Sequence, residues 1–407
     1  MPSATPLPRG PSRLALFGAE DLLGYPGCAV CRYAADAGDQ FLGWFALEGH
    51  GDPGLITRLC QSLGPCPPHT RALLAQPGAE TRMTAVYRYL LRAATEHLAA
   101  GTSPRAPCPG CIRAVEAEQR ALDTLLTGLR EDELRERYRD ADGLCLPHLR
   151  AAVPSAGRRL AAWLAQDMLA RLADRTPRPA VIAGEGDHDA QIRVRLRAAL
   201  PAEPPPSAGP CRGCHAVALA ERDGLAQPGA VLCPAHLREA CSGLPGSDHV
   251  ALSPAAAQAL KLDSERSVSW LIQVSSVSRL GAAVGKLARV HRAGVVTADC
   301  LGCSAAKTAA ECWLAAGAAG PAAGRTDRLC LRHVMSLRRR DPGGARAAVQ
   351  AAADETAAIL ADLEEAFGKR AWSRRHEPRG REMTAWLQAA SLIDGRVFGG
   401  GPVRPLG

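Results

Sequence analysis

The sequence predicts a mainly α protein, organised as tandem helical modules in two duplicated halves. Paired cysteines and histidines recur four times in the same order along the 407 residues. Apolar residues beside these pairs recur every three or four positions, as on the buried face of a helix. No segment shows a convincing alternation of apolar and polar residues, which would indicate a half-buried strand. A repeated helical architecture therefore explains the pattern best.

Each of the four modules contains a Cys-x-x-Cys pair, a spacer and a Cys-x-x-His pair. The spacers hold 34, 33, 18 and 26 residues. One cysteine pair alone is a weak signal, but four copies completed by Cys-x-x-His are a strong one. The candidate metal ligands, module by module, are Cys28, Cys31, Cys66 and His69; Cys108, Cys111, Cys145 and His148; Cys211, Cys214, Cys233 and His236; and Cys300, Cys303, Cys330 and His333.

Three thiolates and one imidazole are a ligand set that zinc prefers. Zinc takes four such ligands at the corners of a tetrahedron, and a tight turn lets two residues three positions apart face one ion. The four positions are then filled by the protein, which is typical of a structural site rather than a catalytic one. We expect about four zinc ions, each bound within its own module and clipping together the starts of two helices.

Other uses of the cysteines are less consistent with the pattern. Disulfides would need an oxidising compartment, and the 15 cysteines are an odd number. Iron–sulfur clusters are the alternative cofactor, although they use four cysteines more often than three and a histidine. Cys211 to His215 also matches a haem attachment motif. The other modules do not repeat that histidine, so we interpret it as incidental.

Helices should follow or separate the paired motifs. Within the second module, helical spacing links Ile112, Val115, Leu122, Leu125, Leu126 and Leu129. Four further segments should bury one helix face, and they run from Met83 to Leu98, Leu160 to Leu172, Val268 to Val290 and Val349 to Phe367. A last helix is expected from Met383 to Ile393.

The order module, helix, module, helix occurs twice along the chain, which predicts an internal duplication. We expect a disordered tail over residues 1–13 and a first half with two modules over residues 14–175. A Pro-rich linker should cover residues 176–210, with a short helix from Ile192 to Leu200. The second half should cover residues 211–370, and a helix with a Gly-rich tail should cover residues 371–407.

Composition and charge restrict the classes of partner only weakly. A net charge of +8 is mild for this length, and arginine clusters at residues 338–340 and 370–381 are interpreted as solvated helix ends. No stretch is apolar enough for a membrane span or a signal peptide, so a cytoplasmic protein without a membrane contact is expected. The pattern gives no indication of the oligomeric state.

The modules resemble an uncharacterised family of bacterial helical proteins. Its repeats read Cys-Pro-x-Cys, a long helix, and then Phe or Leu before Cys-x-x-His. The segment from Pro107 to Leu149 fits best, with Cys108-Pro-Gly-Cys111 and Leu144-Cys145-Leu-Pro-His148, whereas the third and fourth modules have shorter spacers. The resemblance implies metal ligation and a helical fold, and it implies no substrate.

A non-enzymatic, zinc finger-like scaffold that binds another macromolecule, in the first place a protein, fits these features. A zinc-dependent regulator that binds nucleic acid is one alternative, and a thiol-based redox or metal sensor is another. The sequence has no nucleophile–base pattern and no Gly-rich phosphate loop, which argues against an enzyme. Asp187-His188-Asp189 is the one compact histidine–carboxylate cluster, and we interpret it as solvated linker.

Overall fold

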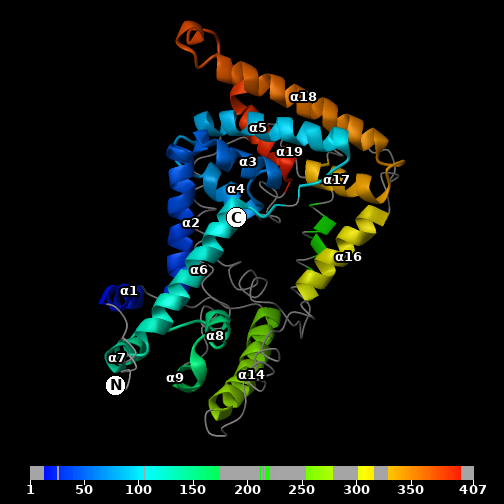
Figure 1. Ribbon diagram of the computed structural model, residues 1–407. Helices are drawn as coiled ribbons and strands as arrows, with labels where there is room; N and C mark the ends of the chain where they lie inside the picture. Colours follow the sequence, from blue (N-terminus) through cyan, green and yellow to red (C-terminus); the bar gives the residue numbers. More distant parts are fainter. Residues whose placement is uncertain are drawn as a thin grey trace, which may run out of the picture. The chain divides into compact units, whose positions relative to one another are not determined.

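In the computed structural model, every regular element among the described residues is a helix (Figure 1). The structure describes residues 13–174 except 25, 26 and 105, then 211, 214, 216, 217, 219, 220 and 223, and the segments 254–277, 301–315 and 329–395. The prediction of a mainly α fold is confirmed. No helix in these segments is long and apolar enough to cross a membrane.

The chain divides into two compact units, and each unit takes residues from both predicted halves. Unit 1 comprises residues 1–37, 114–187 and 225–300, and unit 2 comprises residues 38–113, 188–224 and 301–407. Two of the unit boundaries fall inside helices α2 (Ala29–Leu47) and α6 (Pro109–Gly128). These two helices therefore contribute residues to both units.

Unit 1 is built on the packing of α9 (Gly157–Asp174) against α14 (Pro254–Val277). The short helix α8 (Leu146–Ala152) packs on α9, and α1 (Arg13–Leu23) packs on α7 (Asp132–Asp140). Its most deeply buried side chains come from the end of α6 and from the segments around α7 and α8, namely Leu125, Leu129, Tyr138, Leu144, Leu146 and Leu149.

Unit 2 is built around α5 (Ala79–Ala100), which lies beside the orange helix α18 (Arg346–Gly368) in Figure 1. Its core also takes residues from α3 (Pro53–Ser62), α4 (Pro67–Leu74), α17 (Leu331–Arg340) and α19 (Ala385–Ile393). The remaining elements of this unit are α16 (Leu301–Ala315) and the 3₁₀ turns η1 (Gly49–Gly51), η3 (Trp372–Arg374) and η4 (Arg381–Thr384).

The two long helix pairs have corresponding places in the sequence order. Helices α5 and α14 each precede the last module of their predicted half, and α9 and α18 each follow it. In unit 2, α5 of the first predicted half packs on α18 of the second. In unit 1, α14 of the second predicted half packs on α9 of the first. Neither unit is made from one predicted half alone.

Local signals explain where several helices begin and end. The Asp52 carboxylate accepts a 2.6 Å hydrogen bond from the backbone N–H of Leu55, and this caps α3, which starts with Pro53. Helix α3 ends at Ser62 and is followed by its C-cap Leu63, which is left-handed with a φ of 51°. Helix α5 ends at Gly101, where glycine takes the left-handed conformation at low cost.

The predicted helical faces are largely confirmed. Met83, Leu90 and Leu91 of α5 are fully buried, as are Leu363 of α18 and Leu392 of α19. The face predicted for α6 is wrong at its start, because Ile112 is 37% exposed and Val115 is 64% exposed. The face predicted for α18 is wrong at its end, because Phe367 is 45% exposed. Some predictions fall outside the described residues. They concern residues 278–290 after α14, the linker helix from Ile192 to Leu200 and both chain ends.

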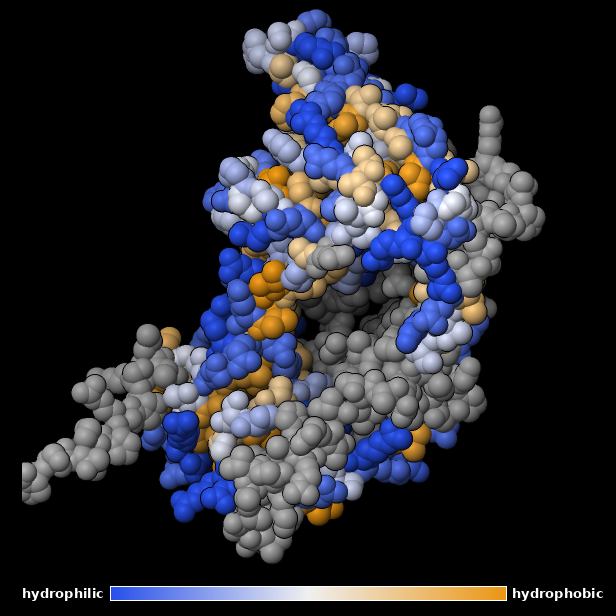
Figure 2. Space-filling model, turned by 45° about the vertical axis from the view of Figure 1, so that its right-hand side comes forward, coloured by the Kyte–Doolittle hydropathy of each residue, from blue (hydrophilic) through white to orange (hydrophobic). Residues whose placement is uncertain are grey.

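Hydrophilic residues dominate the described surface drawn in Figure 2, and hydrophobic residues form several small groups between them. Nine large hydrophobic side chains among the described residues are exposed, and Trp372, Phe17 and Val115 are the most exposed of them. Apolar side chains scattered in this way are ordinary for a folded domain.

Candidate metal centres

The structure brings twelve of the sixteen candidate ligands together in three groups that could each hold a metal ion. In each group, the four ligand atoms lie within 4.8 Å of one another. Site A consists of Cys28, Cys31, Cys145 and His148; site B consists of Cys66, His69, Cys108 and Cys111; and site C consists of Cys211, Cys214, Cys330 and His333.

The expectation that each module holds its own ion is wrong for these three sites. Each site joins the Cys-x-x-Cys pair of one module to the Cys-x-x-His pair of another. In the first predicted half, the outer pairs form site A and the inner pairs form site B. The two-residue spacing inside a pair brings two ligands together, whereas helix packing decides which two pairs meet.

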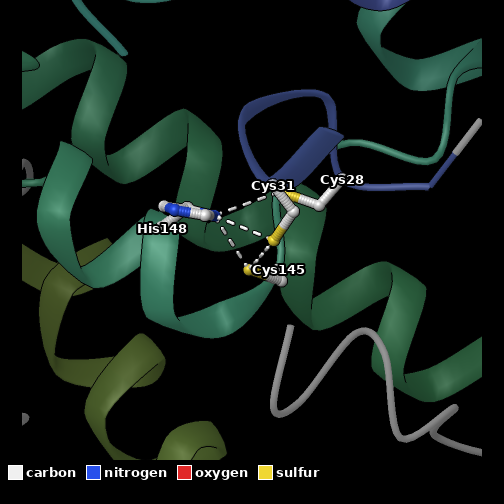
Figure 3. Close-up of side chains that lie close together, drawn as sticks. All are labelled: Cys28, Cys31, Cys145 and His148. Atoms are coloured by element: carbon white, nitrogen blue, oxygen red, sulfur yellow. Dashed lines mark hydrogen bonds between the residues drawn. The ribbon is translucent and has the colours of Figure 1, made fainter. Parts of the chain in front are cut away.

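Site A lies where α2 and α8 begin, and Figure 3 shows its four side chains converging. The Nδ1 atom of His148 is 3.3 Å from the sulfur of Cys28, 3.4 Å from that of Cys31 and 3.2 Å from that of Cys145. The sulfurs of Cys31 and Cys145 are 3.7 Å apart. All four residues belong to unit 1.

Site B has the same arrangement at the starts of α4 and α6 in unit 2. The Nδ1 atom of His69 is 3.0 Å from the sulfur of Cys66, 3.7 Å from that of Cys108 and 3.5 Å from that of Cys111. The sulfurs of Cys66 and Cys111 are 3.5 Å apart. The ring of His69 thus faces the three thiols through the same nitrogen as His148.

Site C, also in unit 2, is the one whose three cysteines are all buried. The Nδ1 atom of His333 is 3.4 Å from the sulfur of Cys211, 3.5 Å from that of Cys214 and 3.2 Å from that of Cys330. The sulfurs of Cys214 and Cys330 are 3.8 Å apart. Site C repeats the outer pairing of site A in the second predicted half.

The three Cys-x-x-His pairs share one local structure. Cys66, Cys145 and Cys330 each stand at the N-cap of a helix with extended backbone angles. The helix then brings the histidine, three residues later, over the thiol of the cap. Unpaired N–H groups in the first turn make this end of a helix positive, which favours a thiolate there.

No family model matches the chain, and no curated protein or solved structure matches it. The chemistry of the three sites follows from their residues and geometry.

Two glycines leave room for ligands in unit 2. A Cβ atom at Gly110 would lie 2.8 Å from ring atoms of His69, and one at Gly395 would lie 2.4 Å from the Cβ of Cys211. Both distances are too short for a real contact, so a side chain at either position would displace a ligand. In site A, the backbone N–H of Gly27 donates to Asp142 at 2.7 Å, which fixes the turn before Cys28.

The clustered ligands shift one another's pKa values in opposite directions. Hydrogen bonds with Cys145 and Cys31 hold the pKa of the Cys28 thiol well below its usual value, while burial raises the pKa of Cys145. In site B, the hydrogen bond with Cys66 lowers the pKa of Cys108 to about 3, and the same contact raises that of Cys66. One thiolate therefore disfavours the next, and a divalent ion would offset this repulsion.

The histidines respond to the same thiolates. Burial lowers the pKa of His148, but hydrogen bonds with Cys28, Cys31 and Glu118 outweigh it and raise the value to about 12. Burial also lowers the pKa of His333, but hydrogen bonds with Cys211 and Cys330 outweigh it and raise this pKa to about 10. Both rings are thus held against negative charge.

The last predicted ligands are Cys233, His236 and Cys300, which lie outside the described residues, as does the side chain of Cys303. Asp187-His188-Asp189, His215 and Cys241 also lie outside them. Cys60 is half-buried and Cys312 is exposed, and neither belongs to a ligand group among the described residues. Burial raises the pKa of the Cys60 thiol.

One side chain that no sequence motif marks also contacts a candidate ligand. Glu118 of α6 has a carboxylate oxygen 3.3 Å from the Nε2 atom of His148. Glutamates are frequent on exposed helix faces, so only the contact with a candidate ligand distinguishes this one.

Proposed function

We propose that the protein is a non-enzymatic scaffold of the cytoplasm, in which about four structural zinc ions hold helices in place for binding to another protein. The observation that carries this proposal is the presence of three sites, each with three sulfurs and one imidazole nitrogen around one point. Closed sites of this composition are typical of structural zinc.

The separations between ligand atoms suit a single tetrahedral ion. With ~2.3 Å for a zinc–sulfur bond and ~2.0 Å for a zinc–nitrogen bond, tetrahedral angles give roughly 3.8 Å between sulfurs and roughly 3.5 Å between sulfur and nitrogen. One sulfur–sulfur pair in each site lies 3.5 to 3.8 Å apart. The sulfur–nitrogen distances are 3.0 to 3.7 Å.

The same distances favour zinc over an iron–sulfur cluster. In a cluster, the ligands bind different irons, with bridging sulfides between them. Those ligands would have to stand farther apart than four atoms that all lie within 4.8 Å of one another. Mixed thiolate and imidazole ligation in a tetrahedron also matches the preferences of zinc.

The count of four ions follows from the order of the motifs. Sites A and C both join the first cysteine pair of a predicted half to its last Cys-x-x-His pair. Applied to the inner pairs of the second half, this nested order assigns Cys233 and His236 to the same ion as Cys300 and Cys303. The side chains of these four residues lie outside the described part, so the assignment rests on motif order alone.

A structural role follows from where the sites lie. Sites A and B each tie together the first turns of two helices that are far apart in sequence. Binding of zinc to such a site contributes directly to folding, by roughly 10–16 kcal/mol in small zinc peptides. Each ion would therefore fix helix positions rather than act on a substrate.

The contacts of two arginines weigh against nucleic acid as the partner. In the basic segment after α18, Arg374 lies 2.7 Å from Glu365 and 2.7 Å from Glu377, and Arg381 lies 3.5 Å from Asp362. Guanidinium groups already paired with carboxylates are less available to phosphates, on which nucleic-acid affinity depends.

Elemental mass spectrometry of protein purified without added metal tests the zinc proposal. About four zinc ions per chain in a colourless sample would support it, whereas iron with visible absorption would contradict it. For the partner, the full chain would be used as bait beside Cys111→Ser and Cys312→Ser. A partner retained by wild type and Cys312→Ser but lost with Cys111→Ser would support a zinc-dependent scaffold. Recovery that is equal for all three baits would contradict it.

Two further assays discriminate the alternatives. Salt-dependent binding of oligonucleotides would favour the nucleic-acid regulator, and no binding at low salt would exclude it. Zinc release at modest peroxide doses, with oxidation of the ligand thiols, would favour the redox sensor. We expect neither result for a closed structural scaffold.

A further inference from the structure

The two ring nitrogens of His148 have different partners. Its Nδ1 atom faces the three sulfurs of site A at 3.2 to 3.4 Å. Its Nε2 atom lies 3.3 Å from a carboxylate oxygen of Glu118. The ring is thus held between the metal-binding sulfurs on one side and a negative charge on the other.

Glu118 reaches the ring from a different helix. It lies on α6, whereas His148 lies in the first turn of α8, and both residues belong to unit 1. The side chain of His148 is 12% exposed and that of Glu118 is 40% exposed. The partly exposed carboxylate can therefore accept a hydrogen bond from the Nε2–H group of a largely buried ring.

Such a contact has a defined effect on a metal-binding histidine. When Nδ1 binds the ion, the ring proton must be on Nε2, and this N–H group can donate a hydrogen bond to the carboxylate. The hydrogen bond fixes this tautomer and the ring orientation, and it makes the ring a stronger ligand. Loss of such a partner commonly reduces metal affinity by about 10- to 100-fold.

We propose that Glu118 is a positioning residue of site A, which holds His148 in the Nδ1-binding tautomer and strengthens the hold of this site on its ion. This inference rests on the proposed zinc function. It makes site A dependent on a side chain that belongs to none of the four modules' ligand pairs.

The test uses the full chain loaded with ¹¹³Cd²⁺, whose NMR resonance reports the ligands of each bound ion separately. The variants are Glu118→Ala and Glu118→Gln, and the control is Asp123→Asn. Asp123 lies exposed on the same helix, and its change to Asn removes one negative charge, as the changes at Glu118 do. Chelator competition on the zinc form measures how tightly the sites hold metal.

In Glu118→Ala, we expect one cadmium resonance to move and one zinc ion to be lost to chelator about 10- to 100-fold more readily. Glu118→Gln keeps an acceptor oxygen and should show a smaller loss, while Asp123→Asn should match wild type. If wild type has the resonances of three-sulfur, one-nitrogen sites but Glu118→Ala moves none of them, the inference is wrong. Absence of such resonances from wild type would instead contradict the zinc function itself.

Discussion

The sulfur of Cys28 lies 3.3 Å from the Nδ1 atom of His148, although the two residues are 120 positions apart in the sequence. All four ligands of site B lie between them in the chain. Sites A and B are therefore nested, with the inner pairs joined inside the loop that the outer pairs close. Mutations that remove two thiols can test this arrangement.

Two double variants distinguish nested pairing from one ion per module. Cys31→Ser with Cys145→Ser removes two thiols from site A alone, so it should lose one zinc ion. Cys31→Ser with Cys66→Ser removes one thiol from each of sites A and B, so it should lose two. Zinc is measured by elemental mass spectrometry after a wash with chelator. If each module held its own ion, the two results would be reversed.

A single ligand change should weaken unit 2. Cys111→Ser leaves site B with three ligands, and the free energy of unfolding should fall by several kcal/mol because metal binding and folding are coupled. The measurement is urea unfolding of the full chain, followed by helical circular dichroism. Cys312→Ser removes an exposed cysteine outside the three sites and serves as the control. A Cys111→Ser protein that unfolds like the control and keeps its metal would refute a structural role for site B.

A methyl group at Gly110 should loosen site B without removing a ligand. The new Cβ atom would meet the His69 ring at 2.8 Å, and such overpacking costs about 1–3 kcal/mol. The zinc affinity of this site should fall by roughly 5- to 150-fold in Gly110→Ala, as measured by chelator competition.

Gly38→Ala is the matched control for this substitution. Gly38 lies inside α2, and a Cβ atom there would meet nothing within 4 Å. Alanine is favoured over glycine in a helix by up to ~1 kcal/mol, so this variant should be slightly more stable with unchanged zinc binding. Equal zinc affinity in both alanine variants would show that His69 can move aside freely.

An ion pair in unit 2 should stabilise the fold at neutral pH and lose this effect in acid. The hydrogen bond from Lys369, at 2.9 Å, and one from the backbone N–H of Gly380 lower the pKa of Glu382 from 4.5 to about 2. Because the folded pKa is depressed, this contribution is present above pH 4.5 and is lost as the pH falls towards 2.

Lys369→Met should raise the pKa of Glu382 towards 4.5, whereas Lys369→Arg should keep it low. Carbon NMR of the labelled carboxyl group measures this pKa directly. A pKa near 2 in Lys369→Met would show that the backbone contact alone is sufficient.

The ligand pairs were predictable from the sequence because they depend on local geometry. Two ligands three residues apart at a helix start face one point, and Cys145 and His148 do so as expected. The pairing of Cys145 with Cys31 was not predictable, since it depends on how distant helices pack. The repeated motif order suggested that the two pairs of one module share an ion. The structure instead joins the outer pairs in site A and the inner pairs in site B.

The burial of helix faces was likewise predictable only in part. Periodicity predicted the buried face of α5, including Met83 and Leu90, because most of that helix is surrounded by other helices. It failed at Val115 of α6, which follows the apolar spacing but is 64% exposed. An apolar residue at the right spacing is buried only where another element covers it, and the sequence pattern does not contain that neighbour.

The nested order also sets a sequence of events during synthesis. The ribosome releases the four ligands of site B by residue 111, so the smaller loop can close first. Cys28 and Cys31 leave the ribosome before any of them, yet their partners Cys145 and His148 emerge only after site B is complete. The thiols of Cys28 and Cys31 therefore remain without their other two ligands until residues 145 and 148 have been synthesised.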